Sequence, residues 1–408
     1  MEKIQTAIIG GGAAGLFLAN LLTDGKGVVL FERGERLGRK LSATGNGQGN
    51  VTHLRASSKE YFSSTANAER LDGVLRAFDD RATTDFFHAR GLLCTADERG
   101  RVYPAARQAS ALTDILRFGA AGKGVEIRLQ TKILKITKTK DGFLLKAVGE
   151  KGEYEFFAKT VVLCAGGKAA KNFGTDGNGY DLAKSLGHRV TPLFPSLVQL
   201  KTDTDKIKSF KGIRINDGAV TAFYQNAPLQ TVRGDIIFTD YGVSGDAVFR
   251  LSAFLADKTE SGALSLTLDF LPDLTEQEIL QAIQAKRTFL PKLETEELLG
   301  GTVNNQIGRA ILRRAGEDFA QAARLVKNFP LTVRGSLGFD YAQVTKGGVA
   351  MNETDENLQS RLAEGLYFAG EILDVDGQCG GYNLQWAFSS ASLVAQALNT
   401  KRGGQVCV

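Results

Sequence analysis

Three glycines near the start of the chain have the spacing needed to bind phosphate. Gly10, Gly12 and Gly15 follow an apolar run and precede a stretch of helical character. In a strand–turn–helix unit the first glycine permits a tight turn, the second lets a pyrophosphate approach the backbone, and the third lets helix and strand pack closely. Glu32 ends a second apolar run, twenty residues after Gly12, where a carboxylate can bind an adenosine ribose. The pattern predicts a dinucleotide at the positive end of a helix.

A second strand, glycine and acid occur near the end of the chain. Residues 366–370 form a run that ends in Gly370, and Glu371 follows it. Further on, Gly381 precedes residues 383–398, which have the composition of a long helix. We expect Glu371 to contact the middle of an extended ligand; a solvated acid at a strand end is the alternative. The first N–H groups of the helix would point at whatever lies over Gly381.

Other features of the sequence decide which dinucleotide binds. An NAD-dependent dehydrogenase with a self-contained N-terminal domain has no need of a distant strand–glycine–acid segment. A disulfide reductase of the two-dinucleotide kind would carry a second G-x-G-x-x-G pattern and a redox pair of the C-x-x-C type, and the sequence has neither. An FAD enzyme needs the second segment to hold the middle of its cofactor. The sequence therefore predicts non-covalent FAD and no dedicated NAD(P)H domain.

The bulk composition argues against several other classes of protein. A net charge of +5 on 408 residues, with no long block of Lys and Arg, does not indicate binding to nucleic acid or to a membrane surface. Four cysteines without a C-x-x-C pair and three scattered histidines predict neither a disulfide scaffold nor a metal site. No apolar run approaches the length of a membrane span. Because the first predicted strand begins too early to leave room for a signal peptide, we expect a cytoplasmic protein.

The hydrophobic pattern changes along the chain. Residues 67–93 have apolar side chains at helical spacing and predict amphipathic helix. Short alternating runs from residue 192 to 271 indicate a second, β-rich domain. Thr275 and Glu278 then form the capping box of a helix. We expect a dinucleotide domain, a β-rich substrate domain and a helical insertion, which comprise residues 1–191 and 346–408, residues 192–271 and 330–345, and residues 272–329.

Five segments carry a family resemblance. They are IIGGGAAG at 8–15, GRKLSATGNGQGN at 38–50, GTDGNGYDLAKSLGH at 174–188, GVSGDAVFRLS at 242–252 and LYFAGEILDVDGQCGGYNLQWAFSSA at 366–391. With them the chain resembles the bacterial flavoproteins of the HI0933-like group, of the YhiN and aminoacetone oxidase type, which are distant relatives of the fumarate reductases. The resemblance implies an α/β fold: a Rossmann-like, glutathione-reductase-type FAD-binding domain with an inserted β-rich, barrel-like domain and a small helical subdomain.

The resemblance also implies which residues contact the cofactor. Glu32 and Arg33 would bind the adenosine end, and the backbone of Ile133 would meet the adenine. Gly381 and the residues after it would lie beside the isoalloxazine ring. The full set is Gly10, Gly12, Ala13, Ala14, Gly15, Glu32, Arg33, Arg39, Lys40, Thr44, Gly45, Gly47, Asn50, Ile133, Ala165, Gly166, Gly370, Glu371, Asp376, Gly381, Asn383, Leu384 and Gln385.

The chain departs from the family pattern at three places. Gln48 and Gly49 stand where the family often has Arg-Cys, which excludes thiol chemistry at that point. Thr-Asp at residues 239–240 and Ser-Gly-Asp at residues 244–246 replace Thr-His and Ser-Gly-Pro. We expect these changes to lie on the substrate side, so the substrate does not follow from the family.

The resemblance implies a flavoenzyme that oxidises a small primary amine, aminoacetone or an L-amino acid, to an imine that water hydrolyses. O₂ would reoxidise the flavin, and ammonia and H₂O₂ would be released. The residues themselves predict only a flavin site, because FAD carries the redox step while the protein supplies orientation, water exclusion and charge. Two alternatives stay open: an NAD(P)H-dependent reductase of an enone- or steroid-like small molecule, and a non-catalytic flavin-binding module.

Two side chains are candidates for a catalytic role. Lys346 precedes a glycine pair and could place a cation near the flavin, with a solvent-facing lysine as the alternative. Tyr382 follows Gly381 and could form a wall of the substrate pocket, with core packing as the alternative.

Overall fold

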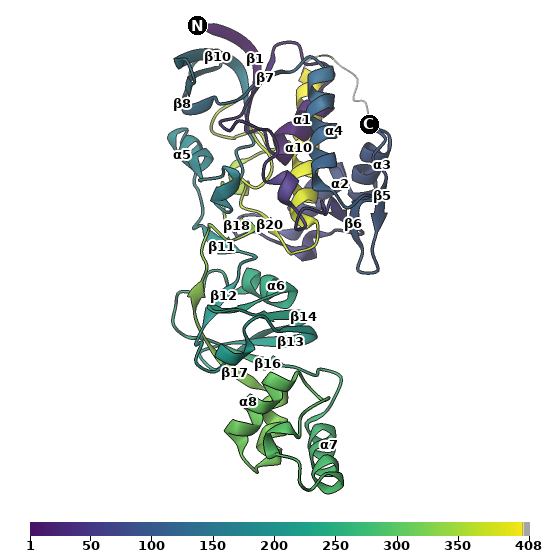
Figure 1. The fold of residues 1–408 in the computed structure, drawn as a ribbon. Helices are drawn as coiled ribbons and strands as arrows, with labels where there is room; N and C mark the ends of the chain where they lie inside the picture. The colour runs from purple at the N-terminus through teal and green to yellow at the C-terminus, as the bar shows by residue number, and fades with distance from the viewer. Residues whose placement is uncertain (402, 404–408) are drawn as a thin grey trace. The chain divides into compact units, whose positions relative to one another are not determined.

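The chain folds into two compact units. The computed structural model describes residues 1–401 and 403, and Cys407 lies outside them. Unit 1 is built around a sheet and draws on both ends of the chain, whereas unit 2 is built around a barrel (Figure 1). The two units comprise residues 1–194 with 344–408, and residues 195–343.

A seven-stranded mixed sheet forms the centre of unit 1. Its parallel strands, in spatial order, are β7 (Glu126–Arg128), β2 (Val28–Phe31), β1 (Glu2–Ile9), β10 (Gly152–Leu163) and β19 (Leu366–Phe368). Antiparallel β9 (Phe143–Gly149) pairs with the first half of β10, and β8 (Lys132–Lys138) pairs with β9. All four residues of β2 and the last four of β1 are buried. Such continuous apolar runs are typical of parallel strands that helices cover on both faces.

The parallel strands end at one level. Ile9 in β1 is the register partner of Phe31 in β2 and of Leu163 in β10. Leu163 is in turn the partner of Phe368 in β19. The chain leaves β1 for β2 on one side, while β10 lies on the other side, so β1 stands where the strand order reverses. Ligands of such sheets bind beyond the carboxyl ends of the strands at this point. The residues that follow these four strands therefore share one edge.

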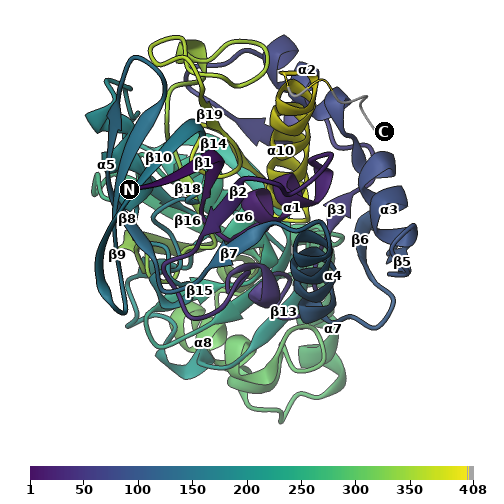
Figure 2. The same cartoon turned by 90° about the horizontal axis from the view of Figure 1, so that it is seen from above.

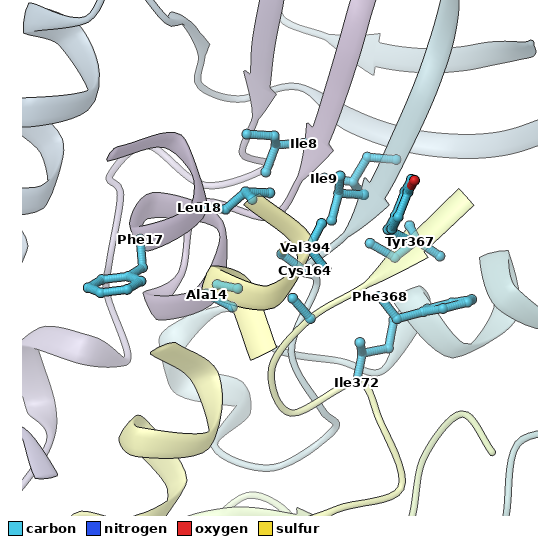
Figure 3. Close-up of a cluster of buried hydrophobic side chains, with 14 of the residues drawn as sticks. Ile8, Ile9, Ala14, Phe17, Leu18, Cys164, Tyr367, Phe368, Ile372 and Val394 are labelled. Atoms are coloured by element: carbon cyan, nitrogen blue, oxygen red, sulfur yellow. The ribbon is translucent and has the colours of Figure 1, made fainter. Parts of the chain in front are cut away.

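Helices from both ends of the chain pack together on the sheet. The α-helices of unit 1 are α1 (Ala13–Leu21), α2 (Ala68–Ala77), α3 (Asp80–His88), α4 (Ala109–Gly122), α5 (Asn178–Ser185) and α10 (Tyr382–Lys401). α1 and α10 run side by side (Figures 1 and 2). Ile9 of β1, Leu18 of α1 and Val394 of α10 lie in one buried cluster with Phe368 (Figure 3). This cluster holds the glycine turn after β1 against the C-terminal helix.

Short strands surround the start of α10. β3 (Thr52–His53), β6 (Arg101–Pro104) and β5 (Cys94–Ala96) form one antiparallel sheet, and β4 (Tyr61–Phe62) pairs with β20 (Asp376–Gly377). β18 (Val344–Lys346) brings the chain back into unit 1, and β11 (Phe194–Ser196) leaves it. The two-residue strands place His53 and Tyr61 near the N-terminus of α10.

Unit 2 is a closed six-stranded barrel with added helices. Its strands are β12 (Leu200–Thr202), β15 (Gly242–Ser244), β14 (Ala227–Phe238), β13 (Arg214–Tyr224), β16 (Leu264–Asp269) and β17 (Phe329–Ser336). Its helices are α6 (Asp246–Leu255), α7 (Glu276–Phe289), α8 (Asn305–Ala315) and α9 (Phe319–Lys327). Alternate residues Leu264, Leu266 and Leu268 are fully buried, as a barrel interior requires. The predicted capping box of Thr275 and Glu278 is confirmed at the start of α7.

The described helices also bear on the question of membranes. Within residues 1–401 and 403, none is both long enough and apolar enough to span a bilayer. α10 has the required length, with twenty residues, but its sequence includes polar side chains such as Asn383, Gln385 and Asn399.

A single buried carboxamide ties the end of α10 to the end of α1. Asn399 Nδ2 donates to Leu21 O at 2.9 Å, and its Oδ1 accepts from both Thr23 N and Thr23 Oγ1 at 3.0 Å. We expect Asn399→Ala to lower the free energy of unfolding of unit 1 by about 1–3 kcal/mol, because it leaves Leu21 O without its donor and both Thr23 N and Thr23 Oγ1 without their acceptor. Trp386, the one tryptophan of the chain, lies in unit 1, and its fluorescence during urea denaturation measures this loss.

The exposed Asn357 provides the matched control, because its side chain makes no hydrogen bond that the structure shows. Asn357→Ala should unfold within about 0.5 kcal/mol of wild type. Equal unfolding midpoints for the two variants would contradict the role given to Asn399.

Candidate functional site

The glycine turn after β1 has one open position and one closed position. α1 begins at Ala13, with Gly12 as its N-cap and Ala14 in its first turn. A Cβ atom at position 15 would lie 2.0 Å from Gly10 O, so only glycine permits this contact between turn and helix. At position 12 a Cβ atom would meet no protein atom within 4 Å. The open face of the turn lies where a pyrophosphate can approach the free N–H groups of α1.

Glu32 joins the glycine turn to the loop after β2. Its Oε2 accepts from Gly11 N at 2.9 Å, and its Oε1 accepts from Gly34 N at 2.7 Å. Its backbone carbonyl accepts from Thr131 N at 2.9 Å, which brings the start of β8, with the buried Ile133, to the same corner. Each carboxylate oxygen retains a second lone pair for a ribose hydroxyl. The corner can therefore hold an adenosine.

Arg33 is engaged by the segment that leads into α5. Its Nη1 lies 2.5 Å from Asp176 Oδ2, and Lys132 is at 3.8 Å from the same oxygen. Burial alone would raise the pKa of Asp176, but the hydrogen bond from Arg33 and the positive charges of Arg33 and Lys132 outweigh it and hold the pKa below its ordinary value. The guanidinium thus fixes residue 176 beside the adenosine corner.

The basic loop after β2 reaches across to both later strand ends. Arg39 Nη2 donates to Asn172 O at 2.8 Å. Lys40 Nζ donates to Glu371 Oε2 at 2.7 Å, across 331 positions of sequence. Thr44 Oγ1 donates to Leu41 O at 2.7 Å and so closes its own turn. Gly45 and Gly47, in the turn that follows, are exposed.

Glu371 lies where the ends of β10, β18 and β19 meet. Its Oε1 accepts from Thr345 N at 3.0 Å. Thr345 Oγ1 in turn accepts from Lys168 N at 2.8 Å and from Ala169 N at 2.9 Å. Ala165 and Gly166 precede this segment directly after β10, and Gly370 precedes Glu371 after β19. The structure thus brings together the glycine–acid segment predicted from sequence and the backbone that follows β10.

Three polar residues near the start of α10 face different ways. The side chain of Asn383 forms two hydrogen bonds with the backbone of the preceding loop. Its Oδ1 accepts from Gly377 N at 2.9 Å, and its Nδ2 donates to Gly377 O at 2.7 Å. Asp376, next to that glycine, is buried. Gln385 is fully buried, and its Oε1 accepts from Thr52 Oγ1 and Thr83 Oγ1. Its side chain therefore points into the protein, whereas the half-buried Leu384 packs against the core.

The two candidate catalytic side chains flank β4. Lys346 Nζ lies 4.3 Å from the centre of the Phe62 ring. Tyr382 stacks on His53 with ring centres 4.6 Å apart, and its carbonyl accepts from Tyr61 Oη at 2.9 Å. Because successive side chains of a strand point to opposite faces, Lys346 and Tyr382 lie on opposite sides of this strand.

Sequence reasoning missed His53 and Tyr61, because two-residue strands show no periodicity. Both rings contact Tyr382, and complete burial raises the pKa of Tyr61 well above its ordinary value. Tyr61 is therefore a neutral phenol at physiological pH. Its hydrogen bond to the Tyr382 carbonyl positions the first residue of α10.

The residues present fit an extended FAD. Gly12 is open for the pyrophosphate, Glu32 is placed for the ribose, and the N-terminus of α10 offers N–H groups at the far end. Asn50 is 8% exposed, and its Oδ1 has no hydrogen-bond partner within the described part of the chain. A buried acceptor of this kind can be completed by a donor from water or from a ligand. FAD carries such donors on its ribityl chain and on its ring.

Comparison with known proteins gives one family for nearly the whole chain. The model of the HI0933-like protein Rossmann domain matches residues 4–397. The 3-dehydro-bile acid delta(4,6)-reductase of Clostridium scindens is 34% identical over 410 residues, which cover 96% of this chain and 98% of that protein. The ribosomal RNA dihydrouridine synthase of Escherichia coli is 30% identical, with 98% of each chain covered. That of Haemophilus influenzae is 28% identical, with 97% and 98% covered.

Solved structures share the fold at low sequence identity. The 3-ketosteroid delta1-dehydrogenase of Sterolibacterium denitrificans matches with a TM-score of 0.56 at 14% identity, over 98% of this chain and 100% of that one. The fumarate reductase subunit FrdA of E. coli matches with a TM-score of 0.52 at 15% identity, over 99% and 71%. The predicted fold class, an FAD-binding Rossmann-type domain with a barrel and a helical part, is confirmed.

The contrast between Gly12 and Gly15 separates cofactor binding from folding. Gly15→Ala should both destabilise unit 1 and weaken FAD binding, because its methyl group meets Gly10 O. Gly12→Ala should unfold close to wild type yet bind FAD at least about tenfold more weakly, because its methyl group occupies the phosphate face. Flavin fluorescence titration and urea denaturation measure the two effects. Unaltered FAD affinity in Gly12→Ala would show that the pyrophosphate binds elsewhere.

Proposed function

The chain belongs to the HI0933-like family of FAD-binding flavoproteins, and from that premise we propose that it reduces a carbon–carbon double bond conjugated to a carbonyl group. It is a flavin-dependent oxidoreductase. The direction of the reaction and its substrate are the proposal. The observation that carries it is the 34% identity, over nearly the whole chain, to a protein named as a bile acid reductase.

The names of the relatives support one chemistry on two substrates. A delta(4,6)-reductase acts on double bonds of a 3-oxo steroid skeleton, where the carbonyl is conjugated with them. A dihydrouridine synthase saturates the C5–C6 bond of uridine, which is conjugated with the C4 carbonyl. In a double bond attached directly to the carbonyl, a hydride adds to the β carbon and a proton adds to the α carbon. In the outer double bond of a 4,6-dienone, the conjugation instead directs the hydride to the δ carbon. FAD, when bound, supplies the hydride chemistry.

Tyr382 is the residue of this chain that we assign as proton donor. It is the first residue of α10, its ring is partly exposed, and it directly follows Gly381, where the first N–H groups of the helix have no acceptor within the helix itself. The stack on His53 and the hydrogen bond from Tyr61 hold it in place. A phenol so positioned can deliver the proton that the α carbon needs.

Lys346 serves the cofactor rather than the substrate in this proposal. It lies on the other face of β4 from Tyr382, and its neighbour Thr345 donates to Glu371. The remaining predicted contacts keep their roles: Ile133 at the adenine, Arg39 and Lys40 in the loop that closes on the cofactor, and Asp376 with Asn383 in the turn before α10.

We propose a small-molecule substrate rather than RNA. The helical segment 272–329 carries eight Lys and Arg side chains and eight Asp and Glu side chains, so its net charge is zero. Several of these pair with one another, as Arg309 does with Glu297 and Arg313 with Glu296, each at 2.7 Å. RNA-binding surfaces collect unpaired cations. The balance supports a substrate without a phosphate backbone.

Amine oxidation with O₂ as acceptor is the competing proposal. It follows from the family resemblance to aminoacetone oxidase, and a free amine with a C–H aimed at the flavin needs no dedicated base. The relatives named above are reductases and synthases, which ranks amine oxidation second. A non-catalytic flavin-binding module ranks third.

Four measurements distinguish the reductase, the amine oxidase and the flavin-binding module. Under anaerobic conditions with NADPH or NADH, the purified flavoprotein should remove the long-wavelength absorbance of a 3-oxo-4,6-diene steroid. Peroxide formed from aminoacetone or L-amino acids without a pyridine nucleotide would instead establish the amine oxidase. Flavin that neither NAD(P)H nor an amine can bleach would leave the binding module. Steady turnover of unmodified ribosomal RNA, but not of the steroid, would move the substrate to RNA.

Removal of one hydroxyl group tests the proton donor. Tyr382→Phe keeps the ring that stacks on His53 and loses only the phenolic proton. We expect the rate of double-bond reduction to fall by about 100-fold or more, while FAD content and flavin reduction by NAD(P)H stay at wild-type levels. Tyr341→Phe, at an exposed tyrosine of unit 2, is the matched control and should react at the wild-type rate. A Tyr382→Phe enzyme with full activity would remove Tyr382 from the mechanism.

A further inference from the structure

A buried carboxamide next to Gly381 has an oxygen without a partner. Asn50 is 8% exposed, and its Oδ1 accepts no hydrogen bond from any residue that the structure describes. By contrast, the oxygen of Gln385, the other buried carboxamide at this end of the site, accepts from two hydroxyl groups. Leaving a buried acceptor unpaired costs free energy, so such an atom gains from a donor that water or a ligand brings.

Asn50 lies beside the N-terminus of α10. A Cβ atom at position 381 would lie 2.8 Å from Asn50 Oδ1 and 2.4 Å from Thr52 O. Asn50 therefore lies against the turn that precedes α10. The first bond within this helix runs from Gln385 N to Gly381 O at 3.0 Å. The N–H groups of Asn383 and Leu384 have no acceptor in their own helix.

Donors and an acceptor thus stand side by side at this turn. The N-terminus of α10 presents N–H groups, and Asn50 presents a carbonyl oxygen next to them. The isoalloxazine ring has the complementary edge, in which a single N3–H donor lies between two carbonyl acceptors. We propose that Asn50 Oδ1 accepts the hydrogen bond of the flavin N3–H and so fixes the orientation of the ring. This inference rests on FAD as the cofactor and is independent of which substrate is reduced.

A recognition role of this kind has a consequence for flavin analogues. FAD methylated at N3 has lost the donor, and its methyl group would meet Asn50 Oδ1. We expect wild-type apoprotein to bind FAD about tenfold or more tightly than 3-methyl-FAD. Asn50→Ala removes the acceptor and makes room for the methyl group, so it should bind FAD and 3-methyl-FAD about equally. Flavin fluorescence titration of the full-length protein measures both constants.

Asn50→Asp separates an acceptor from a donor. A carboxylate can only accept, so this variant should still prefer FAD over its N3-methyl analogue. Asn352→Ala, at an exposed asparagine of unit 1, is the matched control and should discriminate as the wild type does. If Asn50→Ala keeps the full preference, or if Asn50→Asp loses it, the proposal is wrong.

A second measurement uses the wild-type holoenzyme and needs no variant to fold. With ¹⁵N-labelled FAD bound, the N3–H resonance should shift downfield from that of free FAD and exchange slowly with water. An N3 proton that exchanges as fast as in free FAD would overturn the proposal. Because FAD binding itself persists in every expected outcome, failure here leaves the assignment of the reductase untouched.

Discussion

The level ending of four parallel strands is the constraint on which the site depends. The last residues of the four strands are register partners: Ile9, Phe31, Leu163 and Phe368. The chain therefore leaves the sheet at the same level after each of these strands. A slip of one residue in any strand would move each of its side chains to the opposite face of the sheet and would change the level at which the strand ends. Register therefore places residues 10 and 370 at one ligand, although most of the sequence separates them.

Polar contacts across this edge position the site more than they stabilise the fold. Lys40 and Glu371 form a partly exposed ion pair at 2.7 Å, and pairs of this kind contribute about 1 kcal/mol or less. Their value lies in geometry, since Glu371 also holds Thr345, and Thr345 holds the turn after β10. One carboxylate thus fixes the loop after β2 and two later segments relative to each other. The apolar cluster of β1, α1 and α10 supplies the stability that this arrangement uses.

Sequence reasoning succeeded where a local rule dictates one structure. The glycine spacing at 10–15 and the capping box of Thr275 and Glu278 depend on neighbouring residues only. Sequence reasoning failed where a competing local signal, or a residue distant in sequence, determined the structure. The predicted helical stretch 67–93 is divided because Asp79 caps a second helix, its side chain accepting from Ala82 N, and the chain extends at Phe78.

The aromatic group around Tyr382 could not have been predicted from periodicity. His53 and Tyr61 come from two-residue strands. They contact the first residue of α10 only in the tertiary structure. The same holds for the separation of Lys346 from Tyr382. Both stand next to glycines in the sequence, which predicts Lys346 near the flavin and Tyr382 in the wall of the substrate pocket. The alternation of side chains along β4 assigns them to different faces.

The hydrogen bonds of the two buried carboxamides, Asn50 and Gln385, indicate opposite roles for them. In the sequence Asn50 and Gln385 are alike, since each sits in a glycine-rich motif and each could reach the ring. Gln385 Nε2 donates to Phe78 O and Ser389 Oγ, and its oxygen has two donors, so every group it offers is used by the protein. Such a residue anchors α10 and cannot also bind a ligand through its side chain. At the same turn, Asn50 Oδ1 has no partner among the residues that the structure describes. A residue that supports the fold and a residue that binds a ligand differ in whether a side-chain polar atom is left unpaired. That difference follows from the folded structure and not from the sequence.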